Sequence, residues 1–325
     1  MKAFNTSLKT IFVLIFLTVS SQLFSQQQTK VIAYCVPRTP IDSIPFQYVT
    51  HINYSFAIPA KSGDTLMPLK DDSYLKELVQ KSHMHGVKVF ISIGGWGIGD
   101  GGGDDTRFHK MSETAAGQAR FIASTMKLVN TYNLDGVDLD WEYPDPDNRS
   151  ADDYVMLCKN LSQQLHAQGK QLTAAVVSAG KQAYGIKEEV YPYMDWLNLM
   201  VYDGDYGPEE IKHHSPYSMA VRCVDFWLNE RHLPAEKCVL GLPFYAKMGH
   251  GKFGYSYKKL LESGASHYDD YWNGHYYNGT ITIANKTKLA LDKHLAGLMV
   301  WEMSHDTNDE NSLFKTIHDT IMQSK

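Results

Sequence analysis

Eight short runs of apolar and β-branched residues recur along the chain, separated by stretches with apolar residues at three- and four-residue spacing. The runs cover residues 31–35, 48–56, 87–93, 136–141, 172–178, 196–202, 239–245 and 297–301. The clearest helical stretches cover residues 72–85, 115–132, 151–168, 217–230 and 283–294. Strand and helix alternating eight times predict a (β/α)8 TIM barrel, with an open doubly wound sheet as the alternative.

The predicted barrel occupies one domain. The chain contains no Pro/Ser-rich linker, no low-complexity tract and no repeat of solenoid period. About 50 residues separate the seventh and eighth runs, which is too short for a large α+β insertion. We therefore expect a single domain over residues 26–325 with a low wall beside its cleft. We also expect a monomer.

The first 25 residues differ from the rest. Lys2 and Lys9 precede an apolar run at residues 11–19, and small polar residues follow it at 20–22. This pattern predicts a secretory signal peptide over residues 1–25. A membrane anchor is the alternative, but the run has about half of the roughly 20 apolar residues that span a bilayer. We expect a secreted or periplasmic protein without a membrane anchor after cleavage.

Charge and cysteine content argue against several classes of function. The net charge of −5 leaves no basic surplus for phosphates, so nucleic-acid binding is not expected. Four cysteines are scattered without a short-spaced pair, which argues against a zinc site or a redox motif. We expect buried thiols, with one disulfide between Cys223 and Cys238 left open.

The fourth run carries the most informative pattern, Asp-Gly-Val-Asp-Leu-Asp-Trp-Glu-Tyr-Pro at residues 135–144. Side chains alternate along a strand, so Asp138, Asp140 and Glu142 share the face opposite Val137, Leu139 and Trp141. Three carboxylates then point into the barrel. Crowding them in a low-dielectric interior raises at least one pKa, and a carboxyl group that stays protonated near neutrality suits a glycosidase proton donor.

Glu142 is the last carboxylate on this strand and therefore the nearest to the C-terminal mouth, where barrel active sites lie. We assign it the role of general acid. A solvated acidic loop is one alternative, but it does not explain the apolar alternation. A divalent cation held by the same three oxygen ligands is the stronger alternative, although the sequence offers no supporting ligands. We expect neither a metal nor a cofactor.

These residues resemble the signature of family-18 glycoside hydrolases, the chitinase family. The fourth-strand motif includes Asp135, Asp138, Asp140, Glu142, Trp141, Tyr143 and Pro144. The third strand contributes Ser92, Gly94, Gly95 and Trp96, the sixth Asn198, Met200, Tyr202 and Asp203, and the eighth Gly297, Met299, Trp301 and Glu302. The similarity covers residues 31–306, with its motifs in order on the predicted strands.

The resemblance implies hydrolysis of β-1,4-linked N-acetylglucosamine polymers by a substrate-assisted, retaining mechanism, with chitin or chito-oligosaccharides as substrate. Glu142 would act as acid and then as base toward water. Asp140 would orient the acetamido nitrogen and stabilise the cationic intermediate, and Asp138 would share a proton with it. Tyr202 would hydrogen-bond the acetamido carbonyl. An endo-β-N-acetylglucosaminidase acting on N-glycans or peptidoglycan and a non-catalytic chitin-binding lectin are the alternatives.

Further residues would contact the sugar if the resemblance holds. Trp301 would form a floor under the distorted sugar, Asp203 would reach it from the side, and weaker contacts would come from Tyr34, Phe56, Gly95, Trp96, Tyr143 and Met200. Barrel packing is the alternative interpretation for the aromatic residues. The family also implies non-proline cis peptide bonds at Ser55–Phe56, Glu142–Tyr143 and Trp301–Glu302.

Some local patterns point away from function or depart from the family. The G-x-G-x-x-G match at Gly97 is discounted as a dinucleotide site because nearby aspartates would repel a pyrophosphate. His213 and His214 are expected in a solvated loop. Lys247 stands where the family often has arginine, so a substrate contact there is in doubt. A tyrosine-rich segment at residues 255–277 could line outer sugar subsites or pack as a loop.

Overall fold

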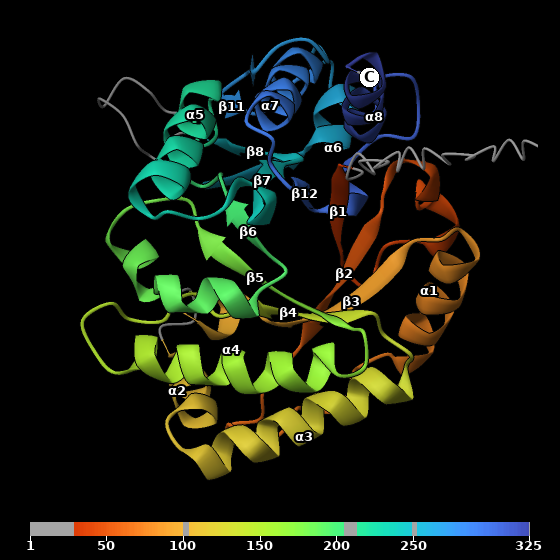
Figure 1. Cartoon of the computed structure of the whole chain (residues 1–325). Coiled ribbons are helices and arrows are strands. Elements are labelled where there is room, and N and C mark those ends of the chain that lie inside the picture. The colour runs from red at the N-terminus through yellow and green to blue at the C-terminus, as the bar shows by residue number, and fades with distance from the viewer. Residues whose placement is uncertain (1–28, 100–103, 205–212, 249–251, 325) are drawn as a thin grey trace, which may run out of the picture.

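The computed structural model describes residues 29–99, 104–204, 213–248 and 252–324. Eight parallel strands close into a barrel in the order β1-β12-β7-β6-β5-β4-β3-β2 (Figure 1). Their bounds are β1 Lys30–Cys35, β2 His51–Ala57, β3 Lys88–Gly94, β4 Gly136–Asp140, β5 Gln171–Val177, β6 Trp196–Met200, β7 Cys238–Pro243 and β12 Gly297–Trp301. The predicted barrel is confirmed, and pairing of β1 with β12 excludes the open sheet.

Helices surround the barrel (Figure 1). They are α1 Asp72–Met84, α2 Thr106–Ser112, α3 Ala115–Thr131, α4 Ser150–His166, α5 Tyr217–Asp225, α6 Tyr257–Glu262, α7 Thr280–Asp292 and α8 Leu313–Gln323, and a π-helical turn Phe226–Glu230 extends α5. Side-chain caps fix four of these starts. For example, Asp71 accepts from the Tyr74 amide at α1, and Thr114 accepts from the Gly117 amide at α3.

Two of the eight connections replace an α-helix by short 3-10 turns. β1 leads into η1 Ile41–Ser43 and η2 Phe46–Tyr48, and β5 leads into η5 Lys181–Gly185 and η6 Glu188–Tyr193. Prolines explain this locally, because Pro40 and Pro45 precede the first pair of turns and Pro192 lies inside η6. Proline lacks the amide hydrogen that continues a helix.

The apolar side chains form two layers, which follow from strand alternation. The outer layer lies between strands and helices and includes Val137, Leu139 and Trp141. The inner layer fills the barrel and includes Ile32, Phe90, Trp196, Val239 and Met299. Residues facing the inner layer at the C-terminal ends of the strands are therefore the ones placed at the barrel mouth.

The segment between β7 and α7 contains a small antiparallel sheet of order β10-β11-β8-β9. Its strands are β8 Tyr245–Met248, β9 Lys252–Ser256, β10 Tyr271–Trp272 and β11 His275–Tyr276. The absence of a large insertion agrees with the prediction. The four short strands of this segment were not predicted.

No helix in the described part of the chain is both long and apolar enough to cross a membrane. The predicted signal peptide, residues 1–25, lies outside the described residues.

Candidate active site

Strand β4 presents alternate side chains to the barrel interior and to the helices. Asp138, Asp140 and Glu142 are 0%, 4% and 7% exposed. On the other face, the Trp141 ring stacks on Phe108 of α2 with centroids 5.3 Å apart, so it belongs to the outer core. The predicted inward orientation of the three carboxylates is confirmed by this division.

Asp138 lies at the centre of a hydrogen-bond cluster inside the barrel. Its Oδ2 accepts from the Tyr34 hydroxyl on β1 at 2.7 Å and from the Ser92 hydroxyl on β3 at 2.8 Å. Its Oδ1 accepts from the Thr173 hydroxyl on β5 at 2.7 Å and from the Asn198 amide on β6 at 3.1 Å. Burial raises the pKa of Asp138, and these four bonds oppose the rise because they favour the ionised form.

The donors around Asp138 were missed as functional partners, although the sequence carried a signal for some of them. Ser92 and Thr173 lie directly opposite Asp138 in the parallel register of β3, β4 and β5. Each is a polar residue at an inward position of a predicted buried strand. Asn198 belongs to a family motif but had no assigned role.

Asp140 has a different environment from Asp138. Burial raises the pKa of its carboxyl group well above the usual value, and the charges of Glu142 and Asp138 raise it further. Its Oδ1 is buried and has no hydrogen-bond partner among the described residues. Because the two carboxyl groups interact, they titrate as a pair rather than as separate residues. The predicted rise of at least one pKa in this cluster is confirmed.

Glu142 lies two residues beyond the end of β4, at the C-terminal mouth of the barrel. The Tyr143 hydroxyl donates to Glu142 Oε2 at 3.0 Å. On the neighbouring strand, the Gly95 amide donates to the Asp140 carbonyl oxygen at 2.9 Å. A β-carbon at Gly95 would come within 2.9 Å of the Phe56 ring, so glycine leaves room for that ring.

Three non-proline peptide bonds at the barrel mouth are cis. They are Ser55–Phe56, Glu142–Tyr143 and Trp301–Glu302, the three bonds that the family resemblance predicts. The prediction of cis bonds at these three positions is confirmed.

Aromatic rings gather beside the carboxylates. The Trp301 ring at the end of β12 lies 5.5 Å from the Tyr34 centroid and 5.8 Å from the Phe56 centroid. Tyr34 is only 1% exposed, which leaves no open ring face for a sugar, and its hydroxyl group serves Asp138 instead. Trp301 and Phe56 are partly buried, whereas Trp96 in η3 (Trp96–Ile98) is 55% exposed.

The end of β6 places Tyr202 and Asp203 at the same mouth. Tyr202 packs with Met200 against the inner core, and within the described part of the chain its hydroxyl has one hydrogen-bond partner, the sulfur of Met299 at 3.8 Å. A thioether sulfur is a weak acceptor, so this hydroxyl can exchange it for a better one. Asp203 has a φ of 59°, a left-handed conformation that aspartate tolerates.

Three side chains surround the Asp203 carboxylate. Its Oδ1 accepts a 2.5 Å hydrogen bond from the Tyr245 hydroxyl and lies 2.9 Å from the Lys247 ammonium. The Nδ1 atom of His214 lies 3.4 Å from the same oxygen. Burial alone would raise the pKa of Asp203, but the bonds to His214, Tyr245 and Lys247 outweigh it and lower the pKa. Asp203 is therefore a fixed negative charge at the mouth.

Comparison with known proteins places this geometry in a family. Residues 21–306 match the family described as Glycosyl hydrolases family 18. The chain belongs to this family. It is 27% identical to "Probable chitinase 2" of Drosophila melanogaster over 80% of this chain and 66% of that protein. It is 28% identical to "Chitinase A1" of Niallia circulans over 68% of this chain and 41% of that protein. The chain thus spans less than two thirds of the length of these curated relatives.

Solved structures agree with the family assignment. A family 18 chitinase from the chitin utilization locus of Flavobacterium johnsoniae superposes with a TM-score of 0.79 and 27% identity, covering 92% of this chain and 96% of that one. A chitinase from Bacteroides thetaiotaomicron gives a TM-score of 0.77 and 25% identity, covering 91% and 97%. This family 18 chain therefore shares its whole barrel with them.

One expectation about this family 18 chain needs correction. His213 and His214 are not solvated: His214 is buried, and burial lowers the pKa of His213 to about 3. The expectation of buried thiols is confirmed, and the disulfide left open between Cys223 and Cys238 is not formed. Lys247, for which a substrate contact was in doubt, forms an ion pair with Asp203.

The side chains with the spacing of metal ligands are not the three carboxylates Asp138, Asp140 and Glu142. Among the described residues, one group of side chains has metal-ligand spacing, and it consists of Asp105, His109 and Asp145. His109 already pairs with Asp105 at 3.1 Å, and the Trp141 indole donates to the same carboxylate at 3.1 Å. Asp138 lies outside this group. Each of its oxygens accepts two hydrogen bonds, which a cation would have to displace.

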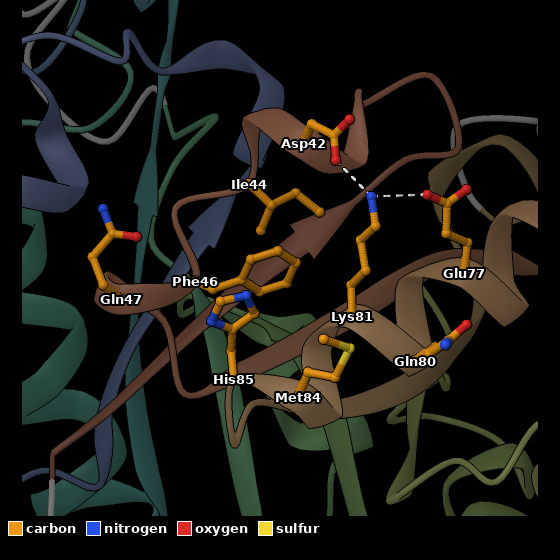
Figure 2. Close-up of a pocket in the computed structure, with 9 residues that line it drawn as sticks. All are labelled: Asp42, Ile44, Phe46, Gln47, Glu77, Gln80, Lys81, Met84 and His85. Atoms are coloured by element: carbon orange, nitrogen blue, oxygen red, sulfur yellow. Dashed lines mark hydrogen bonds and ion pairs between the residues drawn. The ribbon is translucent and has the colours of Figure 1, made fainter.

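A surface pocket of about 720 Å³ lies away from the carboxylates, between the η1–η2 segment and α1 (Figure 2). Phe46 stacks on His85 at 4.6 Å along its wall. The Lys81 ammonium contacts both Asp42 at 2.5 Å and Glu77 at 3.0 Å (Figure 2). With its cation neutralised in this way, the pocket contains no arrangement that suggests catalysis.

Proposed function

We propose that this family 18 chain hydrolyses β-1,4-linked N-acetylglucosamine polymers, chitin or chito-oligosaccharides. The observation that carries the proposal is Asp140, whose buried Oδ1 has no hydrogen-bond partner among the described residues. The N–H of a 2-acetamido group is a donor that would satisfy this oxygen. The names of the curated relatives, which are chitinases, favour the same substrate.

The proposed reaction uses the sugar as its own nucleophile. Glu142 donates a proton to the leaving glycosidic oxygen while the acetamido oxygen attacks the anomeric carbon. Asp140 accepts a hydrogen bond from the acetamido nitrogen and stabilises the resulting cation. Water, deprotonated by Glu142, then opens the cyclic intermediate, and the product keeps its anomeric configuration.

The surrounding residues have supporting roles in this proposal. Asp138, held by four donors, would share a proton with Asp140. Tyr202 would exchange its weak contact with Met299 sulfur for the acetamido carbonyl. Trp301 would lie under the sugar ring, and Asp203 would accept from a sugar hydroxyl group.

The other residues predicted to contact the sugar have roles that follow from their exposure and neighbours. Trp96 is exposed enough to stack on a sugar, and Phe56 and Met200 border the inner core near Trp301 and Tyr202. Tyr143 acts through its hydrogen bond to Glu142. Gly95 contributes its backbone and the space it leaves for Phe56.

We also propose export of the protein, to the periplasm or out of the cell, on the basis of the signal-like pattern in residues 1–25. N-terminal sequencing of protein purified from culture medium and from cells would test this. Retention of residue 1 in all cell fractions would contradict it.

The main test is hydrolysis of chito-oligosaccharides by the wild type and by Glu142→Gln. General acid catalysis contributes about 10²- to 10⁴-fold, so we expect kcat to fall by that factor while the sugar still binds. Asp147→Asn is the matched control, because this carboxylate lies a few residues further on and is exposed. Equal turnover by Glu142→Gln and wild type would contradict the assignment.

A comparison of several substrates distinguishes the proposed chitin hydrolysis from the two alternative functions. Faster release of product from a glycoprotein or peptidoglycan than from chito-oligosaccharides would favour the endo-β-N-acetylglucosaminidase. Binding of chito-oligosaccharides by the wild type without any product would favour the lectin.

A further inference from the structure

The small sheet between β7 and α7 carries a row of side chains that runs across all four of its strands. The register pairs Phe253 of β9 with Lys247 of β8, Lys247 with Tyr276 of β11, and Tyr276 with Tyr271 of β10. Directly paired residues of antiparallel strands point to the same face. We call these four residues the cross-strand row.

A β-bulge keeps Phe253 in this row and removes the other aromatic residue of its strand. Between the pairs Tyr245–Ser256 and Lys247–Phe253, β9 has one residue more than β8. The extra residue reverses the alternation, so Tyr255 lies on the opposite face, where it stacks on His275 at 4.7 Å. Phe253 instead stacks on Tyr245, with centroids 5.3 Å apart.

The face that carries the row is continuous with the candidate active site. Tyr245 and Lys247 are two residues apart on β8 and therefore share this face, and both contact Asp203. The Lys247 ammonium also lies 5.3 Å from the centre of the Phe253 ring. A molecule that extends from the carboxylates past Asp203 therefore meets the cross-strand row next.

The ends of the row are exposed to an unusual degree for aromatic residues. Phe253 is 66% exposed and Tyr271 is 54% exposed, and Tyr276 between them is partly buried. Neighbouring strands lie about 4.8 Å apart, so the row spans about 14 Å from Phe253 to Tyr271. This length fits two or three sugar units of an extended β-1,4-linked chain.

The chemistry of the row suits a saccharide. The faces of a pyranose ring present C–H groups, which pack on aromatic rings, and its hydroxyl groups pair with tyrosine hydroxyls and an ammonium. We propose that the cross-strand row binds sugar units of the N-acetylglucosamine chain that lie beyond the one held at the carboxylates. This inference rests on the proposed function for the identity of the sugar.

The test compares Phe253→Ala and Tyr271→Ala with wild type on chito-oligosaccharides from the dimer to the hexamer. Tyr255→Ala is the matched control, because Tyr255 is an exposed aromatic residue of the same strand that faces away. Removing one aromatic contact is expected to raise KM for the hexamer about two- to tenfold, with the effect shrinking as the substrate shortens. Thermal unfolding of each variant checks that it is folded. If Phe253→Ala does not fold, Tyr271→Ala, on the opposite edge strand of the sheet, still tests the row.

Two outcomes would overturn the inference: the same KM change at every chain length, or an equal effect of Tyr255→Ala. Binding is measured separately, by the change in tryptophan fluorescence when the hexamer is titrated. If the wild type hydrolyses no chito-oligosaccharide, the proposed function fails, yet weaker hexamer binding by Phe253→Ala and Tyr271→Ala than by Tyr255→Ala still supports the row. Unchanged binding in those two variants defeats the row whether or not the enzyme is active.

Discussion

Gly94 lies so close to Asp140 that a β-carbon on the glycine would come within 2.1 Å of the Asp140 carbonyl oxygen. Gly94 also has a φ of 127°, which side chains of L-residues rarely adopt. The glycine thus lets β3 and β4 approach each other beside the candidate catalytic carboxylates.

Gly94→Ala is therefore expected to lower the free energy of unfolding by at least about 2 kcal/mol, because both the backbone and Asp140 would have to move. Activity should fall with it. Urea unfolding measures the change, and Gly97→Ala is the control, because a β-carbon there meets nothing within 4 Å. Equal stability of the Gly94 and Gly97 variants would refute the close approach.

Tyr34→Phe removes one of the four donors to Asp138. The hydrogen bond favours the ionised carboxylate, so its loss raises the pKa of the coupled Asp138–Asp140 pair. We expect the acidic limb of the kcat/KM profile to move to higher pH and kcat to fall roughly tenfold, since a bond to a charged group is worth about 1.5–3 kcal/mol. A pH–rate series from pH 4 to 8 measures both. An unshifted acidic limb would show that Tyr34 does not act through this carboxylate.

The state of the cysteines gives a simple check of the core. All four are buried free thiols, and burial raises the pKa of Cys35 and Cys223 to about 11. A thiol reagent is expected to react with none of them rapidly in the folded protein and with all four after denaturation. Two reactive thiols in the denatured, unreduced protein would instead indicate a disulfide.

The barrel could be predicted from sequence because its strands are buried on both faces and its helices carry apolar stripes, which leave strong periodic signals. The inward placement of Asp138 and Glu142 followed from alternation alone. The role of Lys247 could not be foreseen in this way. Its partner Asp203 is distant in sequence, and the strands of the small sheet are as short as two residues, too short to show a period.

His214 shows the same limit from another side. A histidine pair between polar residues is typical of a solvated loop. His214 is nevertheless buried, and its ring lies beside Asp203. Nothing local to residues 213–215 indicates burial. The contacts of this segment come from residues distant in sequence: the Tyr245 ring lies 5.1 Å from the His214 ring, and the Lys286 ammonium of α7 donates to both the carbonyl and the hydroxyl oxygen of Ser215.

Lys286 itself allows a prediction of how stability depends on pH. Its ammonium is fully buried and donates to Ser215 and to Asn278 Oδ1 at 2.7–2.8 Å. Burial lowers its pKa from 10.5 to about 7, while Asp270 and Cys223 act in the opposite direction. Between these two pKa values the unfolded chain binds the proton and the folded chain does not. The lysine therefore makes the folded state more stable as pH rises through this window.

Comparison of the wild type with Lys286→Met isolates this effect, because methionine is close in size and does not titrate. From pH 6.5 to pH 9.5, the wild type should gain about 3 kcal/mol of unfolding free energy relative to the variant. Urea unfolding of both proteins at the two pH values measures the gain, and other titrating groups cancel in the difference. A constant difference between the two proteins would mean that Lys286 keeps its proton throughout, and that its three hydrogen bonds outweigh the cost of burying its charge.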